Sequence, residues 1–281
     1  MGYAGRFPEE KIREWDDIHH YQKRGWIFRG QKDSEWALET CLERACRGFE
    51  RELTNARHVE KTLLREFQRK YHHYARHIPK TSDVLEWFSL MQHYGAPTRL
   101  LDFAYSIYVA TYFALESAGK EAKEEQEEWG ERKCVVWAIN ADWAVNESAE
   151  KFREDSVEKI FLLSPITEKS ADAFNLTFMR TKPKAFACPI NPFRLNERLT
   201  IQKSVFMCPG DVTKPFEFNL RELNRSGESG NVVKLLIKLK RRRKFLNSLS
   251  AMNVSRATLF PGLDGFAQSL MVSLPVKLLG E

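Results

Sequence analysis

The sequence has no long apolar run and few cysteines, and both absences narrow the class of protein. No stretch of about eighteen consecutive apolar residues occurs in the 281-residue chain, so we expect no membrane-spanning helix. The N-terminal segment 1–17, MGYAGRFPEEKIREWDD, has no apolar signal region. The five cysteines form no C-x-x-C pair, and their odd number is typical of free thiols in a reducing compartment. We therefore expect a cytoplasmic protein that makes no contact with a membrane and binds no metal.

Three common catalytic and nucleotide-binding motifs are missing as well. The chain contains neither G-x-G-x-x-G nor G-x-x-x-x-G-K-[ST], which excludes the dinucleotide-binding loop of Rossmann folds and the P-loop. It also lacks G-x-S-x-G, the motif that presents a nucleophilic serine in many hydrolases. Any nucleotide site in this protein must therefore be built from other residues.

Apolar residues and positive charge are both present, and the charge is unevenly distributed. Hydrophobic residues make up 43% of the chain and aromatic residues 12%, which is enough for a substantial core. The segment 238–244, KLKRRRK, contains six basic residues, a number equal to the net charge of +6 of the whole chain. Two interpretations stay open, an exposed helix start and a contact with nucleic acid. The residues that would make this contact are Lys238, Lys240, Arg241, Arg242, Arg243 and Lys244.

The pattern of apolar residues predicts a single α+β domain over 1–281, with its core at about 25–270. Asp83 is a suitable N-cap and Gly95 a suitable stop for the helix between them. The almost wholly polar segment 119–133 predicts an exposed insertion. We expect helices over 9–24, 57–77, 83–95, 106–118 and 242–255, and strands over 25–31, 134–140, 198–206 and 231–240.

One segment concentrates polar residues between two apolar helices. In LMQHYGAPTRLLDFAYSIYVATYFALE, Pro97 ends the first helix, and Thr98, Arg99 and Asp102 follow within five residues. This density indicates a site. For Asp102 alone, an N-cap of a helix over 103–116 or an ion pair with Arg99 is an equally good interpretation.

Arg29 is a second candidate, because it leaves the short apolar run WIF immediately before Gly30. The planar guanidinium of an arginine binds phosphate or carboxylate through two parallel hydrogen bonds. Arg29 is therefore either a clamp for an anionic ligand or a partner of a nearby carboxylate of the protein.

Four blocks of the sequence together resemble the FRG domain family, which is named after a Phe-Arg-Gly motif. These blocks are FRGQ (28–31), QHYGAPTRLLDFAYSIYVATYFAL (92–115), RLTIQKSVF (198–206) and LFPGLDGFAQSL (259–270). The resemblance extends over roughly 25–270. The family is frequent in bacteria and their phages, so it implies a toxin or defence role without naming a reaction.

A weaker resemblance, to ADP-ribosyltransferases, suggests a chemistry and a mixed β core like theirs. Those enzymes carry a basic residue on an early strand, a Ser/Thr segment before a helix and a Glu or Gln on a later strand. Arg29, Thr98 and Gln202 occur in that order. The resemblance implies that NAD is the substrate, and that Arg29, Asp102 and Gln202 form the catalytic set. The implied NAD-binding residues are Gly30, Gln31, His93, Tyr94, Thr98 and Arg99.

The chain departs from the transferase pattern at position 202, where it has Gln in place of Glu. A neutral amide can orient a hydroxyl group but cannot act as a general base. Another carboxylate would have to take that role, and the candidates are Asp102, Glu197 and Asp264. Without such a carboxylate, the protein would bind a nucleotide without turning it over.

Three functions follow from these residues. The leading hypothesis is an enzyme that transfers ADP-ribose to a protein or nucleic acid, or that hydrolyses NAD. The alternative is a non-catalytic module that recognises a nucleotide or a protein. The third is a nucleic-acid-acting protein that uses the basic segment 238–244.

Overall fold

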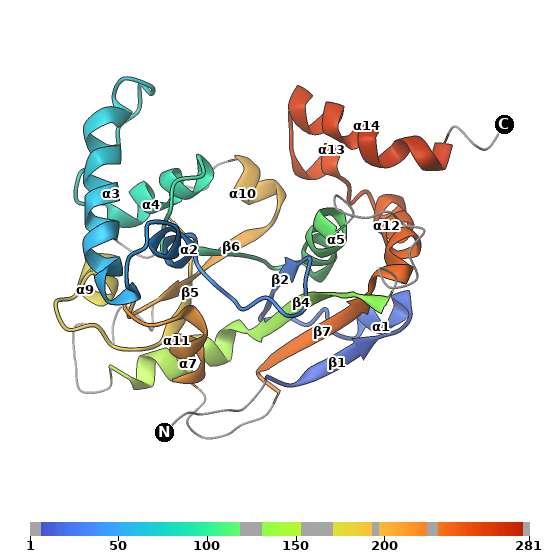
Figure 1. Ribbon diagram of the computed structural model, residues 1–281, viewed down its shortest axis with the longest axis horizontal. Helices are drawn as coiled ribbons and strands as arrows, with labels where there is room; N and C mark the ends of the chain where they lie inside the picture. Colours follow the sequence, from blue (N-terminus) through green and yellow to red (C-terminus); the bar gives the residue numbers. More distant parts are fainter. Residues whose placement is uncertain (1–6, 119–130, 153–170, 193–196, 224–229, 278–281) are drawn as a thin grey trace.

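A computed structural model describes residues 7–118, 131–152, 171–192, 197–223 and 230–277. The chain forms a single α+β domain around one mixed sheet of seven strands, in the order β1-β7-β4-β2-β3-β6-β5 (Figure 1). All neighbours pair antiparallel except β1 and β7, which are parallel. The strands are β1 Glu9–Ile12, β2 Trp26–Gln31, β3 Leu101–Ala104, β4 Lys133–Asn140, β5 Ala187–Ile190, β6 Ser204–Pro209 and β7 Val232–Lys238.

Helices cover both faces of the sheet, and each face has its own apolar core. Alternation along β2 explains the division, because Ile27 packs into one core and its neighbour Phe28 into the other. The helices α3, α4, α7 and α9 pack on the Ile27 face, and α5 and α12 on the Phe28 face. The helices are α1 Trp15–His19, α2 Cys41–Gly48, α3 Ala56–Tyr71, α4 Val84–His93, α5 Ile107–Ala118, α7 Ala141–Glu150, α9 Ala171–Phe178, α10 Glu197–Ile201, α11 Phe216–Arg221, α12 Arg242–Ala251, α13 Arg256–Leu259 and α14 Leu263–Lys277, with the 3₁₀ turns η1 Leu53–Asn55 and η3 Leu239–Arg241.

Gly30 allows α5 to lie directly on β2. A Cβ atom at this position would lie 2.0 Å from the carbonyl oxygen of Ala110 and 2.6 Å from the amide nitrogen of Ala114. The missing side chain of Gly30 and the small side chains of both alanines therefore permit the close approach of strand and helix. This contact links the Phe-Arg-Gly motif to the alanine-containing helix that follows it in the sequence.

The middle of the sheet is partly open. Strand β2 forms six residue pairs with β4 but only one with β3, between Phe28 and Ala104. Beyond this pair the two strands no longer run side by side in the ladder, so the sheet consists of two groups joined at a single point. The opening lies next to Arg29 of β2 and Asp102 of β3.

Several sequence predictions are confirmed at the level of single residues. The side chain of Asp83 accepts a hydrogen bond from the amide of Glu86 at 3.1 Å, as an N-cap does. Gly95 follows α4 with a φ of +80°, a conformation that favours glycine. The strands predicted over 25–31, 134–140 and 231–240 correspond to β2, β4 and β7.

Three elements differ from the sequence predictions. The predicted helix 9–24 contains β1, an edge strand whose exposed charges hide its β character. Asp102 lies within β3 and is not an N-cap, since α5 begins only at Ile107. The predicted strand 198–206 begins as the helix α10, and both Leu199 of this helix and Gln202 of the turn that follows it are buried. Most of the predicted insertion 119–133 lies outside the described residues.

Candidate functional site

The opening in the sheet leads into a cleft of about 260 Å³. Its walls are formed by β2, β3, β6, α4, α5, α10 and the turn after α10. Apolar atoms of Phe103, Phe113 and Leu199 form part of the lining. The polar side chains in the lining belong to Arg29, Ser89, Gln92, His93, Asp102, Gln202 and Ser204.

Arg29 is a half-buried cation with an unsatisfied donor. Its Nη1 donates a hydrogen bond to the main-chain carbonyl oxygen of Asp102 at 2.7 Å. Its Nε is buried and has no hydrogen-bond partner among the described residues. Burial lowers the pKa of Arg29 from its ordinary value, and the nearby Asp102 carboxylate opposes this effect. An arginine stays protonated in spite of such a shift, so a positive charge lines the cleft.

A chain of side-chain hydrogen bonds orients Asp102. Thr98 Oγ1 donates to Gln92 Oε1 at 2.6 Å, and Gln92 Nε2 donates to Asp102 Oδ2 at 2.7 Å. Thr98 Oγ1 in turn accepts from the amide of Leu100 at 3.1 Å, which fixes the direction of the whole chain. Asp102 Oδ1 has no hydrogen-bond partner within the described part of the chain. The carboxylate therefore keeps one oxygen for a ligand in the cleft.

Gln202 lies at the opposite wall of the cleft and is 6% exposed. Its Nε2 donates to the carbonyl oxygen of Leu259 at 3.1 Å, which ties the end of α13 to the cleft wall. The structure thus brings Gln202 and Arg29 to one cavity, as the sequence predicts. Gln202 sits in the turn after α10, however, and not on a strand.

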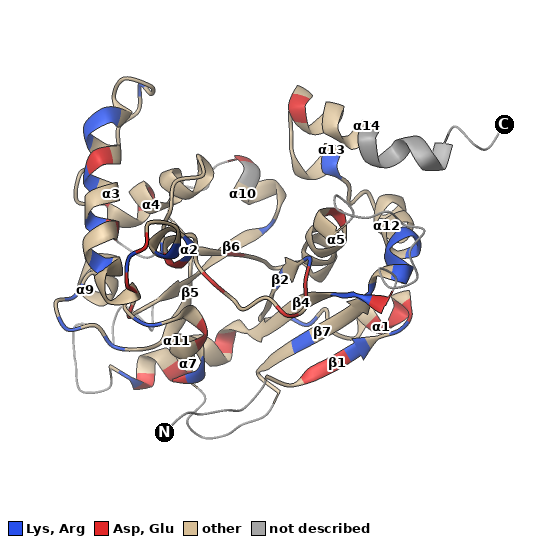
Figure 2. Ribbon diagram, viewed as in Figure 1, with Lys and Arg blue, Asp and Glu red and all other residues tan. Residues whose placement is uncertain are grey.

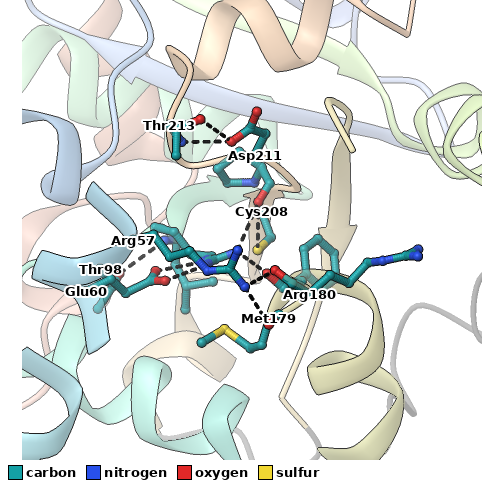
Figure 3. Close-up of polar contacts among 12 residues, drawn as sticks. Arg57, Glu60, Thr98, Met179, Arg180, Cys208, Asp211 and Thr213 are labelled. Carbon is teal, nitrogen blue, oxygen red and sulfur yellow. Dashed lines mark hydrogen bonds and ion pairs between the residues drawn. The ribbon is translucent and has the colours of Figure 1, made fainter. Parts of the chain in front are cut away.

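Arg99 is placed elsewhere, in a buried polar cluster between α3, α9 and β6. Figure 3 shows Arg57 and Glu60, which belong to this cluster. It is 2% exposed and forms a two-fold contact with the fully buried carboxylate of Glu60, with a distance of 2.6 Å from Nε to Oε1. Its Nη1 donates to the carbonyl oxygen of Phe178 at 2.7 Å. Arg57, one turn before Glu60 on α3, donates to the carbonyls of Met179 and Thr181 at 3.0 and 2.7 Å. These contacts join the end of α9 to α3 and give Arg99 a structural environment.

Four residues that the sequence places at the NAD site do not line the cleft. Thr98 and Arg99 lie behind it, with Thr98 in contact with Gln92. Gln31 binds the carbonyl of Ala37 and the indole nitrogen of Trp137, and Tyr94 is 66% exposed at the end of α4. The predicted residues that do share the cleft are Arg29, Gly30, His93, Asp102 and Gln202.

Sequence reasoning missed Ser89 and Gln92, which reach the cleft from α4. Together with His93 they occupy positions i, i+3 and i+4 of this helix, and such positions share one face. This row of polar residues on an otherwise apolar helix is the sequence feature that could have identified them. Its neighbours Leu85, Trp87, Phe88 and Met91 are all buried.

Acidic side chains cover much of the basic segment 238–244. Figure 2 shows basic and acidic residues close together around α1 and α12. Glu14 pairs with Arg241 at 2.6 Å and with Lys244 at 2.7 Å. Glu131 contacts both Lys238 and Lys240, the latter at 2.8 Å, while Arg242 Nε donates to the carbonyl of Leu115 at 2.8 Å. Contact of this segment with nucleic acid stays a prediction.

The described residues contain no helix long and apolar enough to cross a membrane. The same residues contain no group of three or more His, Cys, Asp or Glu side chains that could hold a metal ion.

The fold and the cleft define an α+β domain with a polar site where its sheet divides. The model of the FRG domain family matches residues 24–123, which contain β2, α4, β3 and α5. This match confirms the resemblance to the FRG family over this segment, which includes Arg29, Gln92 and Asp102 but not Gln202. No curated protein and no solved structure matches the chain.

Proposed function

We propose that the cleft binds NAD, and that the protein transfers ADP-ribose to a macromolecular acceptor or hydrolyses NAD, as a bacterial or phage toxin or defence factor. The observation that supports this function is the pairing of two side chains in one cleft. Arg29 is a half-buried cation whose Nε–H has no partner among the described residues, and Asp102 is a carboxylate with only one oxygen hydrogen-bonded by them. The order of Arg29, Thr98 and Gln202 in the sequence supports the choice of NAD.

Arg29 supplies the binding energy for the anionic part of the ligand. A buried donor without an acceptor costs about 1–3 kcal/mol, and an oxygen of the ligand would remove this cost. A phosphate oxygen is the best acceptor, because a charged hydrogen bond is stronger than a neutral one. Arg29 is therefore assigned to the phosphate or the adjoining ribose of NAD.

Asp102 is the only carboxylate in the described lining of the cleft, so the acid–base role falls to it. In the reaction, the bond between C1′ of the ribose and the nicotinamide nitrogen breaks, and its electron pair stays with the nicotinamide. The positive charge that develops on the ribose is stabilised by the Asp102 carboxylate. Water or an acceptor hydroxyl then forms a bond to C1′, and its proton passes to Asp102 and on to solvent.

Incubation of the purified protein with NAD tests this function, with nicotinamide release and transfer of labelled ADP-ribose as the measurements. Acceptors should include protein, RNA and DNA. We expect Arg29→Lys to weaken NAD binding, because it keeps the charge but loses the planar fork. We expect Asp102→Asn to retain binding and to lose roughly a hundredfold or more in turnover.

Arg47→Lys is the matched control, because Arg47 pairs with Glu39 and is 66% exposed, away from the cleft. It should leave binding and turnover unchanged. Absence of both NAD binding and nicotinamide release in the unmodified protein would overturn the proposed function.

A non-catalytic nucleotide-binding module is the second candidate. It is favoured by the neutral Gln202, whose amide nitrogen is already engaged by the carbonyl of Leu259. Binding of NAD without release of nicotinamide, and with no change of turnover in Asp102→Asn, would support this candidate instead.

A further inference from the structure

A second cavity of about 580 Å³ lies beside the cleft, between α10 and the C-terminal helices α13 and α14. Figure 1 shows α10 and α13–α14 on either side of this part of the molecule. We call it the outer cavity. Its lining includes His93, Glu197, Arg256, Phe260, Asp264 and Gln268.

The outer cavity and the cleft share walls. His93 lines both cavities. Phe113 of the cleft meets Phe260 of the outer cavity edge to face, with 5.9 Å between ring centroids. Gln202 of the cleft holds the carbonyl of Leu259, the residue before Phe260. The two cavities are therefore adjacent.

The cleft alone is small for a dinucleotide. Its volume of about 260 Å³ is below the roughly 300–1,000 Å³ that is common for small-molecule sites. A nicotinamide-ribose unit needs only part of the volume that the whole of NAD requires. The remainder of the ligand must extend out of the cleft, and the outer cavity is the space that adjoins it.

The outer cavity contains a planar platform for an aromatic ring. The guanidinium of Arg256 lies 4.6 Å from the centroid of the Phe260 ring. Arg256 Nη1 donates to the carboxylate of Glu116 at 2.6 Å, which fixes the plane of the guanidinium. Arg256 Nε is buried and has no hydrogen-bond partner among the described residues. Stacking against such planes is the usual way in which proteins hold a nucleobase.

The backbone holds this platform in place. A Cβ at Gly265 would lie 1.9 Å from the carbonyl oxygen of Phe260, so only glycine lets α14 start this close to Phe260. Asp264 and Gln268 lie four residues apart on α14 and therefore on one face of the helix. A carboxylate and an amide are suited to the amino group and ring nitrogens of a base.

The two cavities differ in the charged side chains that line them, and so in the ligand groups that they favour. Glu116 balances Arg256, so the outer cavity is left with the carboxylates of Glu197 and Asp264. Negative side chains disfavour a phosphate and favour a neutral group that donates hydrogen bonds. The cleft, in contrast, contains the cation of Arg29, with the Asp102 carboxylate as its only described acidic side chain.

From these observations we infer that the outer cavity binds the adenosine end of the dinucleotide, with the adenine stacked at Phe260 and Arg256. This inference rests on the proposed function, because it takes NAD as the ligand. The nicotinamide-ribose end then lies in the cleft next to Asp102, and the phosphates pass between the two cavities near Arg29.

Fragment binding to the full chain tests the inference, with AMP, ADP-ribose and nicotinamide mononucleotide as probes and calorimetry as the measurement. Phe260→Leu removes the aromatic face at similar volume, and Gln268→Ala removes one polar contact. We expect Phe260→Leu to weaken AMP and ADP-ribose roughly tenfold, as the loss of one stacking contact does. Nicotinamide mononucleotide should bind this variant within about a factor of two of the unmodified protein, since it does not reach the platform.

Phe266→Leu is the control on the same helix, because Phe266 is 54% exposed and does not line the cavity. It should leave all three probes unchanged. The inference fails if the unmodified protein binds neither AMP nor ADP-ribose at about 1 mM, a very weak affinity. It also fails if Phe260→Leu leaves AMP unaffected or weakens all three probes equally.

These outcomes distinguish the inference from the proposed function. If Phe260→Leu still releases nicotinamide and binds AMP as the unmodified protein does, the adenosine subsite is excluded and the proposed function is retained. Selective loss of AMP binding without any nicotinamide release would keep the subsite and remove the catalytic function.

Discussion

Arg29 Nη1 donates to the main-chain oxygen of Asp102 at 2.7 Å, at the point where β2 and β3 cease to pair. The Arg29 side chain thus joins β2 to β3 where the two strands make no main-chain pair. The contact leaves the rest of the guanidinium and the Asp102 carboxylate available to the cleft. The polar site therefore lies at the position where the sheet divides.

Replacement of Arg29 by Met should separate stability from ligand binding. Desolvation of the Arg29 guanidinium is costly and is only partly offset by the nearby Asp102 carboxylate, so Arg29→Met should leave the free energy of unfolding unchanged or raise it by about 1 kcal/mol. Urea denaturation measures this change, and the thermal shift on addition of NAD measures binding, which should be lost. A loss of more than about 2 kcal/mol of stability would instead make Arg29 a structural link between the strands.

The sequence allowed the local elements of this site to be predicted better than their contacts. The cap at Asp83, the stop at Gly95 and strand β2 follow from short-range chemistry, and all three are present. The pairing of Arg99 with Glu60 joins residues 39 positions apart, and no local pattern encodes it. From the sequence, Arg99 is therefore predicted to bind the ligand together with Thr98, although it belongs to the buried cluster.

The edge strand β1 and helix α10 show the same limit for the fold. The pairing of Glu9 with Lys234 of β7 gives β1 its conformation, and this partner lies far away in the sequence. In RLTIQKSVF, apolar and polar residues fit both a strand and a short helix. The structure places a helix in its first half and β6 in its second half.

The stability of the protein should depend strongly on the presence of both partners of the Arg99–Glu60 pair. Arg99→Met or Glu60→Leu alone leaves a buried charge without its partner, and each should cost about 3–5 kcal/mol. The double variant should be less destabilised than either single one, because it removes both charges. Denaturant melts of the three variants form the necessary double-mutant cycle.

Arg69→Met on the same helix α3 is the control for this cycle. Arg69 pairs with Glu66 at 3.0 Å but is 65% exposed, so its loss should cost at most about 0.5 kcal/mol. Equal effects of Arg69→Met and Arg99→Met would contradict the structural role of Arg99.

Glu43 should give the protein a distinct pH dependence. Burial raises the pKa of Glu43 above 4.5, although hydrogen bonds from Thr40 and Phe216 lower it in part. Between the unfolded and the folded pKa, the folded state binds more protons. The contribution of Glu43 to the free energy of unfolding should therefore fall as pH rises from about 4.5 and level off above the folded pKa.

Glu43→Gln removes this titration, so the difference in stability between the two proteins isolates it. Relative to the unmodified protein, the variant should gain stability as pH rises through this window. Urea melts at several pH values measure the difference. A difference that stays constant with pH, or that changes in the opposite direction, would exclude the raised pKa.

The basic segment 238–244 offers a test through its acidic partners. If it contacts nucleic acid, Glu14→Gln and Glu131→Gln should strengthen binding, because they free Arg241, Lys244, Lys238 and Lys240 from their ion pairs. Filter binding to RNA and DNA at increasing salt measures the affinity and its salt slope. Absence of binding in the double variant at low salt would leave the segment as an exposed start of α12.

Substitution of Gln202 tests whether this position tolerates a carboxylate or requires an amide. The resemblance to transferases favours Gln202→Glu as a change that restores a catalytic group. The structure favours the opposite result, because the amide nitrogen donates to the carbonyl of Leu259 at a site that is only 6% exposed. A carboxylate there would face that carbonyl oxygen, and the change should cost about 1–3 kcal/mol.

Since this bond ties α13 to the cleft, Gln202→Glu should also weaken binding of the adenosine end. Gln202→Met is the matched control, since it removes the hydrogen bond at similar volume without adding a charge. Both variants should show a loss of AMP binding, and Gln202→Glu should be the less stable of the two. If Gln202→Glu keeps full stability and hydrolyses NAD faster, the cleft accepts a carboxylate at position 202. The hydrogen bond to Leu259 is then not needed at this position.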